Sequence, residues 1–170
     1  MTTEAARMAE LSELLQHGYR YALSLTHHKT RAEDLLQDAW VAVLQARGAR
    51  TRSYLFSAIR TRFLNLYKRE RLVPMIPLAD AHVELDMDDD LRDIGPLFRV
   101  EEQALEAALA SLRPVEREAL FLAAVQDYTA QEVAELTKQT RGTVLSLIHR
   151  ARHKLRRMLP QRDERQESGS

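Results

Sequence analysis

Apolar residues recur every three or four positions over most of this chain, which is the spacing of amphipathic helices. The first such stretch covers residues 11–25 and ends near the pair His27-His28. The second begins at Thr30-Arg-Ala-Glu33, which fits a capping box, and the third runs from about Ser53 to Arg71. The pattern therefore predicts a three-helix unit in the N-terminal part, a size at which a domain is only marginally stable alone.

The C-terminal part has the same periodicity, interrupted by turn signals. A helix is predicted from Glu101 to Leu112, and Pro114 stands in the first turn of the next helix, where proline is tolerated. A second capping box, Thr129-Ala-Gln-Glu132, begins a short helix. The turn TKQT separates it from a longer basic helix, RGTVLSLIHRARHKLRRML. A short helix, a tight turn and a longer basic helix form the helix-turn-helix pattern.

An acidic segment, residues 73–100, lies between these parts and contains three of the five prolines. Pro74 and Pro77 oppose a continued helix, and the carboxylates of residues 86–90 repel one another. Two interpretations stay open: a flexible linker, or an acidic segment that competes with nucleic acid for a basic channel. The expected fold is all-α: a three- to four-helix domain over 1–72, this linker, a four-helix helix-turn-helix domain over 101–160 and a disordered tail over 161–170.

Charges are segregated along the chain although the formal net charge is zero. Residues 1–72 carry a net charge of +5, residues 73–103 carry −7 and residues 104–170 carry +2. Such blocks indicate charged partners. Attraction between the acidic linker and the basic first domain is one possible source of a closed, inhibited arrangement, and salt would weaken it.

Composition excludes several classes of function. The chain has no cysteine, so disulfides, thiolate catalysis and Cys-ligated zinc are excluded. Only five glycines and no nucleophile–base pairing argue against a phosphate-binding loop and against an enzyme. His149 and His153 stand four residues apart, but no Cys or carboxylate at suitable spacing completes a metal site, so no metal site is expected. No apolar run is long enough to span a membrane and no secretory signal is visible, so a cytoplasmic location is expected.

The last predicted helix has an apolar stripe led by Val144 and Ile148. Its opposite face carries hydroxyls, imidazoles and guanidiniums, at Thr143, Ser146, His149, Arg150, His153 and Arg157. Such a face suits phosphates and base edges in a major groove, and the alternative is a merely solvated basic face.

Two earlier helices also carry candidate chemistry. In the helix from Ser53, cations alternate with aromatic residues such as Tyr54 and Tyr67, as single-stranded nucleic acid requires. Core aromatics beside a solvated cationic face explain that helix equally well. In the capped helix, the single tryptophan, Trp40, is either a core residue under an acidic edge or the anchor of a protein-docking surface.

Three stretches together resemble the extracytoplasmic-function sigma factors, a group of small two-domain bacterial transcription initiation factors. RAEDLLQDAWVAVLQ is similar to their polymerase-binding helix, and YLFSAIRTRFLNLYKRER to the helix that contacts the melted minus-ten element. The segment from LRPVEREALFLAAVQDYTAQEVAEL through GTVLSLIHRARHKLR is similar to their minus-thirty-five-binding domain. The resemblance covers about Leu11 to Leu159.

The resemblance implies three sets of site residues and no cofactor. Docking on a coiled coil of the largest subunit of core RNA polymerase falls to Glu33, Asp34, Leu35, Gln37, Asp38 and Trp40. Contacts to the minus-ten strand, with capture of an extruded base, fall to Arg50, Arg52, Ser53, Tyr54, Ser57, Arg60, Thr61 and Lys68. Contacts to the minus-thirty-five element fall to Thr129, Thr140, Arg141, Thr143, Leu145, Ser146, His149, Arg150 and His153.

The resemblance also implies promoter DNA and an anti-sigma factor as partners, and weak DNA binding by the free chain. A second hypothesis stays open: a sigma-like mimic that binds an anti-sigma factor or polymerase without initiating. Its support is Leu145, which stands where the family usually has a cation, and Leu147, which replaces a frequent Arg. These leucines widen the apolar stripe, meet a protein, or, at Leu145, contact a thymine methyl group.

Overall fold

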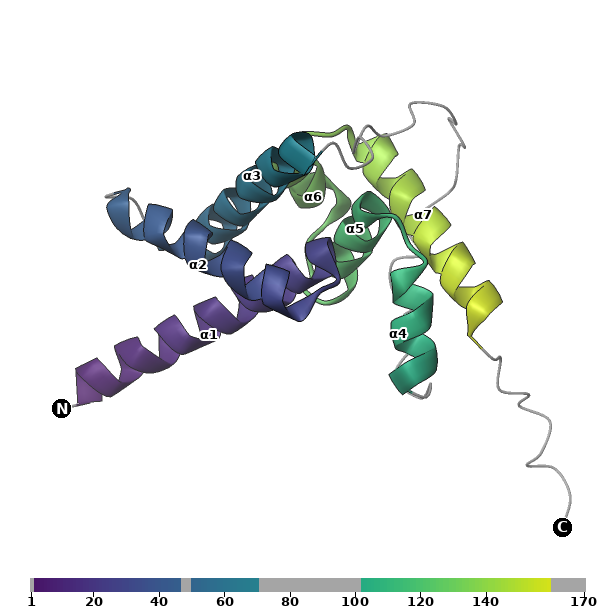
Figure 1. The fold of residues 1–170 in the computed structure, drawn as a ribbon. Coiled ribbons are helices and arrows are strands. Elements are labelled where there is room, and N and C mark those ends of the chain that lie inside the picture. The colour runs from purple at the N-terminus through teal and green to yellow at the C-terminus, as the bar shows by residue number, and fades with distance from the viewer. Residues whose placement is uncertain (1, 47–49, 71–101, 160–170) are drawn as a thin grey trace, which may run out of the picture.

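The computed structural model describes residues 2–46, 50–70 and 102–159, and within them it contains seven helices in two groups (Figure 1). We call α1–α3 the first module and α4–α7 the second module. The helices are α1 (Thr2–Thr26), α2 (Lys29–Gln45), α3 (Arg52–Glu70), α4 (Glu102–Ala110), α5 (Pro114–Ala124), α6 (Ala130–Thr137) and α7 (Arg141–Met158). The predicted linker and tail, residues 73–100 and 161–170, lie outside the described residues.

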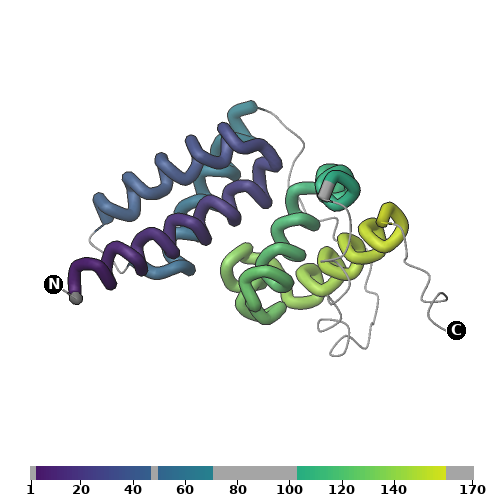
Figure 2. The backbone as a smooth tube through the Cα atoms, turned by 90° about the horizontal axis from the view of Figure 1, so that it is seen from below, coloured from purple at the N-terminus to yellow at the C-terminus, as the bar shows by residue number. Residues whose placement is uncertain are grey.

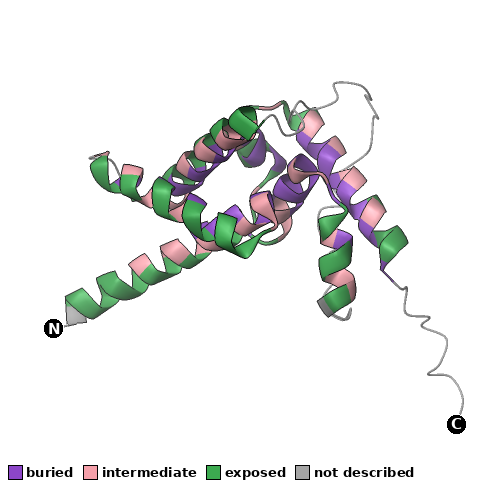
Figure 3. Ribbon diagram, viewed as in Figure 1, coloured by how far each residue is buried: buried purple, intermediate pink, exposed green. Residues whose placement is uncertain are grey.

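The helices of each module bury the apolar stripes that the periodicity predicts, and these buried side chains form one cluster across both modules. In the first module, α1, α2 and α3 pack pairwise and bury Tyr21, Leu25, Leu55, Phe63 and other large side chains. In the second, α5 and α6 pack against α7, and the predicted stripe on α7 is buried: Val144, Ile148, Ala151, Leu155 and Leu159. Buried positions lie where the helices face one another, whereas the N-terminal half of α1 is exposed (Figure 3).

Helix starts confirm one predicted capping box and correct the other. Thr129 is the N-cap of α6: its hydroxyl accepts from the backbone N–H of Glu132, and its own N–H donates to the Glu132 carboxylate. The capping box predicted at Thr30 is wrong, because α2 begins at Lys29. His27 takes a left-handed φ of 50° and His28 is extended, so Nδ1 of His28 accepts from the Arg31 N–H instead.

The two modules pack directly against each other, α1 against α5 and α3 against α6 (Figure 2). The first module thus loses solvent contact over one side of α1 and α3. None of the described helices combines the length and the hydropathy that crossing a bilayer requires.

Candidate protein and nucleic-acid interfaces

The solvent face of α2 combines acidic and apolar groups. Two pairs of polar residues are exposed there, one turn apart along the helix: Glu33 with Asp34, and Gln37 with Asp38. Two large apolar side chains continue the face, Val41 at 52% exposed and Leu44 at 47%. Trp40 is half-buried and packs against the core with part of its ring. The core interpretation of Trp40 therefore holds in part, and its role as a docking anchor stays a prediction.

One residue of the predicted docking set does not lie on this surface. Leu35 is 5% exposed and belongs to the core of the first module. Its place follows from helical geometry, because Ala32, Leu35, Ala39 and Val43 form the buried stripe of α2. The prediction that Leu35 is a docking residue is corrected to a packing role.

The predicted minus-ten residues divide between open and covered positions. Ser53, Ser57, Lys68, Arg50, Tyr54 and Thr61 are exposed. Arg52 is half-buried: it donates to Oε1 of Gln126 at 3.4 Å and lies 3.1 Å from Nε2 of His17. Arg60 is 9% exposed. The cations of this helix are therefore not one continuous solvent face.

A surface hollow of about 480 Å³ lies beside the start of α3. Its walls combine cations with apolar groups of α1: Arg7, Met8, Leu11, Leu14, His17, Arg50 and Arg52, together with Glu10 and Glu13. The cations of this lining suit the phosphates of a nucleic-acid strand, and Glu10 and Glu13 oppose them.

Arg60 belongs to a buried polar cluster that links the two modules. Its Nε donates to Oε1 of Glu118 on α5 at 2.9 Å, and the Tyr21 hydroxyl on α1 donates to the same oxygen at 2.6 Å. The Glu118 side chain is 1% exposed. Burial, then the charge and the hydrogen bond of Glu118, raise the pKa of Tyr21 well above its ordinary value of 10.0.

Neither Glu118 nor Tyr21 was identified from the sequence. A signal was present, because Glu118 lies three residues after Val115 and four before Leu122, in the middle of an apolar helix face. A carboxylate at such a position requires a buried partner. The sequence does not show that this partner comes from the other module.

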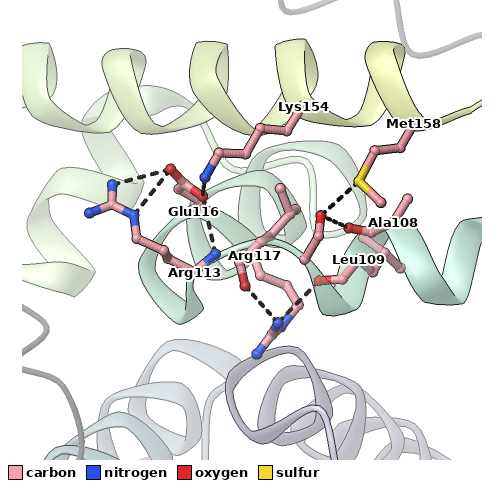
Figure 4. Close-up of polar contacts among 9 residues, drawn as sticks. Ala108, Leu109, Arg113, Glu116, Arg117, Lys154 and Met158 are labelled. Carbon is pink, nitrogen blue, oxygen red and sulfur yellow. Dashed lines mark hydrogen bonds and ion pairs between the residues drawn. The ribbon is translucent and has the colours of Figure 1, made fainter.

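Arg117 forms a second link between the modules. Its Nε donates to the Ser24 carbonyl at 2.5 Å and its Nη2 donates to the Leu25 carbonyl at 3.3 Å, both at the end of α1. Its Nη1 donates to the carbonyls of Leu109 and Leu112 within the second module (Figure 4). One guanidinium therefore joins carbonyls at the end of α1 to carbonyls at and just after the end of α4.

An ion cluster inside the second module connects α5 to α7. The buried carboxylate of Glu116 accepts from Lys154 Nζ at 2.7 Å, from the backbone N–H of Arg113 at 3.1 Å and from Arg113 Nε at 3.2 Å (Figure 4). Burial opposes ionisation, but the hydrogen bond from Lys154 and the N–H and charge of Arg113 outweigh it and lower the pKa of Glu116. The cluster fixes the position of α7 on α5.

The solvent face of α7 keeps most of its predicted groups accessible. His153 and Arg157 are exposed, and Thr143, Ser146, His149 and Arg150 are half-buried. Arg141 is exposed at the first helical position. Two other residues of the predicted minus-thirty-five set cap helices: the hydroxyl of Thr129 caps the N-terminus of α6, and that of Thr140 caps the N-terminus of α7.

The leucines of α7 are packing residues. Leu145 is 8% exposed and Leu147 is 2% exposed, which is the wider apolar stripe considered from the sequence. The expected contact between Leu145 and a thymine methyl group is corrected, because this side chain faces the interior of the protein. The helix is buried over a broader arc than the Val144 stripe alone predicts, since α4, α5 and α6 all contact it.

Both modules match known families. Residues 11–73 match the family model described as Sigma-70 region 2, and residues 102–155 match the one described as Sigma-70, region 4. The chain is 27% identical over 144 residues to the ECF RNA polymerase sigma factor EcfG of Rhodopseudomonas palustris, covering 82% of this chain and 77% of that protein. It is 26% identical over 155 residues to the RNA polymerase sigma factor YlaC of Bacillus subtilis, covering 88% and 90%.

A solved structure shares the fold. The sigma factor RpoE of Bartonella quintana, crystallised with the anti-sigma factor NepR, matches with a TM-score of 0.62 and 23% sequence identity. The match covers 90% of this chain and 96% of that one.

Proposed function

Because the chain belongs to the sigma-70 family of transcription initiation factors, in its extracytoplasmic-function group, we propose that it directs core RNA polymerase to a set of promoters in the cytoplasm. One observation carries this proposal: the region 2 and region 4 matches fall in that order on the two helical modules. The protein acts by binding and positioning, and the chemistry of RNA synthesis belongs to the polymerase.

The exposed face of α2 is the proposed polymerase-docking surface. Asp34 and Asp38 offer carboxylates to cations of the partner, and Val41 and Leu44 supply apolar area beside them. An interface of this kind takes its orientation from the charges and most of its affinity from buried apolar groups.

The open part of α3 and the hollow beside it are the proposed minus-ten site. Ser57, Thr61 and Lys68 are exposed on α3, which supports their proposed contacts with the backbone of an unpaired strand. An extruded base enters the hollow near Arg50 and Arg52, which lowers the cost of strand opening.

The accessible face of α7 is the proposed minus-thirty-five site. The proposed contacts to base edges fall to the half-buried Ser146, His149 and Arg150, and those to phosphates fall to the exposed Arg141 and His153. Capping by Thr140 fixes the start of this helix, next to the proposed contacts.

Charge reversal tests the docking surface. We expect the double variant Asp34→Lys/Asp38→Lys to lose polymerase binding by about a hundredfold or more, because like charges then face each other across the interface. The control is Glu4→Lys/Glu135→Lys, which makes the same change of charge at exposed positions of α1 and α6. Affinity is measured with fluorescently labelled core polymerase, and circular dichroism checks the fold. Equal affinity of the two variants would place docking elsewhere.

A decoy is the second candidate function, and the pairing of Arg60 with Glu118 favours it. A chain held closed in this way binds a partner through α2 without offering Arg60 to DNA. In vitro transcription from a promoter library separates the two functions: sequence-specific initiation supports a sigma factor, and polymerase binding without initiation supports a decoy. Like its structural relative, the chain is a candidate ligand for an anti-sigma factor in either case.

A further inference from the structure

The turn between α6 and α7 contains a residue in a costly backbone conformation. Lys138 is the C-cap of α6 and has φ 55° and ψ 43°, in the left-handed region. A Cβ atom crowds the backbone in this region, so glycine, or less often asparagine, usually occupies it at a helix end. The turn therefore uses a lysine where a glycine would fit with less strain.

Nothing that Lys138 contacts in the folded chain compensates for this cost. The turn is held by main-chain atoms, because the N–H groups of Lys138 and Gln139 both donate to the Ala134 carbonyl. The Lys138 side chain is exposed, and no ion pair joins it to an acidic group in the part of the chain that the structure describes. A strained residue that neither packs nor pairs within the fold indicates a function outside it.

The turn brings Lys138 to the end of α7 where the proposed minus-thirty-five contacts begin. Lys138 lies two residues before Thr140, the N-cap of α7, and three before the exposed Arg141. The first turn of α7 contains no acidic residue. Two cations therefore lie close in sequence to the N-terminus of α7, where the helix dipole also favours anions.

A second residue at this end of α7 is also costly for the free chain. Gly142 is exposed, and a Cβ atom there would meet nothing within 4 Å. Its φ is not positive, so neither packing nor backbone conformation requires a glycine, although glycine weakens a helix relative to alanine. A missing side chain in the first turn lets another backbone approach the main chain closely.

We propose that Lys138 contacts a phosphate of the minus-thirty-five DNA, whose backbone passes over Gly142. The proposal rests on the proposed function and adds a binding residue that the helical periodicity did not identify, because Lys138 lies in the turn. The ammonium group neutralises a phosphate and fixes the position of α7 on the duplex, whereas the residues on the face of α7 read the bases. We call this interaction the turn contact.

The test changes the charge of residue 138 in the full chain. Lys138→Asn removes the charge and suits a left-handed backbone, whereas Lys138→Arg keeps the charge. Lys29→Asn is the matched control, because it removes the same charge at an exposed position of the first module. The probe is fluorescein-labelled duplex DNA selected from a random-sequence library on the parent protein at about 0.05 M salt. Affinity is measured by fluorescence anisotropy between about 0.05 M and about 0.2 M salt.

We expect Lys138→Asn to reduce the slope of log affinity against log salt concentration by about 0.9, the value for one lost phosphate contact. That slope corresponds to a loss of affinity of about fifteenfold at about 0.05 M salt and about fivefold at about 0.15 M salt. The loss should be the same for every selected duplex, since phosphates carry no sequence information. Lys138→Arg and Lys29→Asn should keep the slope of the parent protein. An unchanged slope in Lys138→Asn would overturn the proposal, as would a parent protein that selects no duplex.

Thermal unfolding separates the turn contact from a role of Lys138 in the fold. The melting temperature of Lys138→Asn should equal that of the parent protein or exceed it by up to about 4 °C, because asparagine relieves strain. A lower melting temperature together with an unchanged slope would assign Lys138 to the fold and contradict the proposal.

Gly142→Ala tests the path of the DNA backbone. The added methyl group should raise the melting temperature but weaken duplex binding by about fivefold or more, the cost of overpacking a close contact. The salt slope should stay that of the parent protein, since no charge is lost. Equal affinity of Gly142→Ala and the parent would overturn the passage of DNA over this residue.

Initiation with core polymerase is measured separately on the selected duplexes. Its absence in the parent protein contradicts the proposed function, whereas the salt slope is measured without polymerase and judges the turn contact alone.

Discussion

At the scale of single residues, Glu116 shows how a buried carboxylate stabilises the second module. Its lowered pKa means that the folded state favours the charged form. The stabilisation is therefore complete above the ordinary value of 4.5 and is lost as pH falls through the lower folded value. We expect Glu116→Gln to reduce the free energy of unfolding by about 1.5–3 kcal/mol at neutral pH, the range for hydrogen bonds to charged groups.

Urea denaturation followed by circular dichroism at a series of pH values checks this prediction. The difference between Glu116→Gln and the parent protein should narrow below pH 4.5, where the parent carboxylate also becomes protonated. Glu135→Gln, at an exposed site, should differ little from the parent at any pH. If the difference in free energy of unfolding between Glu116→Gln and the parent protein does not change with pH, the effect comes from packing rather than from charge.

At the scale of elements, two helical glycines predict opposite effects on stability. A Cβ at Gly18 of α1 would lie 2.7 Å from Leu55 Cδ2 and 2.9 Å from Leu36 Cδ1, so α2 and α3 must shift their side chains. A Cβ at Gly142 of α7 meets nothing within 4 Å. Gly18→Ala should destabilise the chain by about 1 kcal/mol, because overpacking costs more than helix propensity returns.

Gly142→Ala is the matched comparison and should stabilise the chain by about 0.5–1 kcal/mol through helix propensity alone. Thermal unfolding of both variants and of the parent protein measures the two changes in stability. Stabilisation by Gly18→Ala would show that the contact of α1 with α2 and α3 is looser than the structure has it.

At the scale of the whole molecule, the buried pair of Arg60 and Glu118 and the acidic linker predict different responses of the module packing to salt. Between about 0.1 M and about 1 M salt the screening length falls from about 10 Å to about 3 Å, which weakens attraction between exposed charges. The buried pair of Arg60 and Glu118 is shielded from this effect. We expect the radius of gyration from small-angle X-ray scattering to stay constant over that range. Expansion of the chain at high salt would assign the packing of the modules to attraction by the linker.

The helices and their faces followed from local rules. The apolar stripe from Val144 to Leu159 and the N-cap at Thr129 depend on residues within one or two turns, so periodicity and capping patterns predict them. The start of α2 was misplaced by two residues from Thr30 to His28, because an imidazole at the cap is outside the usual set of Ser, Thr, Asp and Asn.

Sequence alone therefore determined the family, the all-helical modules, the exposed acidic face of α2 and the accessible polar face of α7. The burial of Leu145 and the sequestration of Arg60 depended on the assembled helices. The burial of Leu145 depends on the three helices that precede α7, whereas Arg60 is covered by a distant segment: 58 residues separate Arg60 from Glu118, and 97 separate Tyr21 from Glu118. Helical periodicity says which residues share a face, and only packing between the modules determines what that face meets.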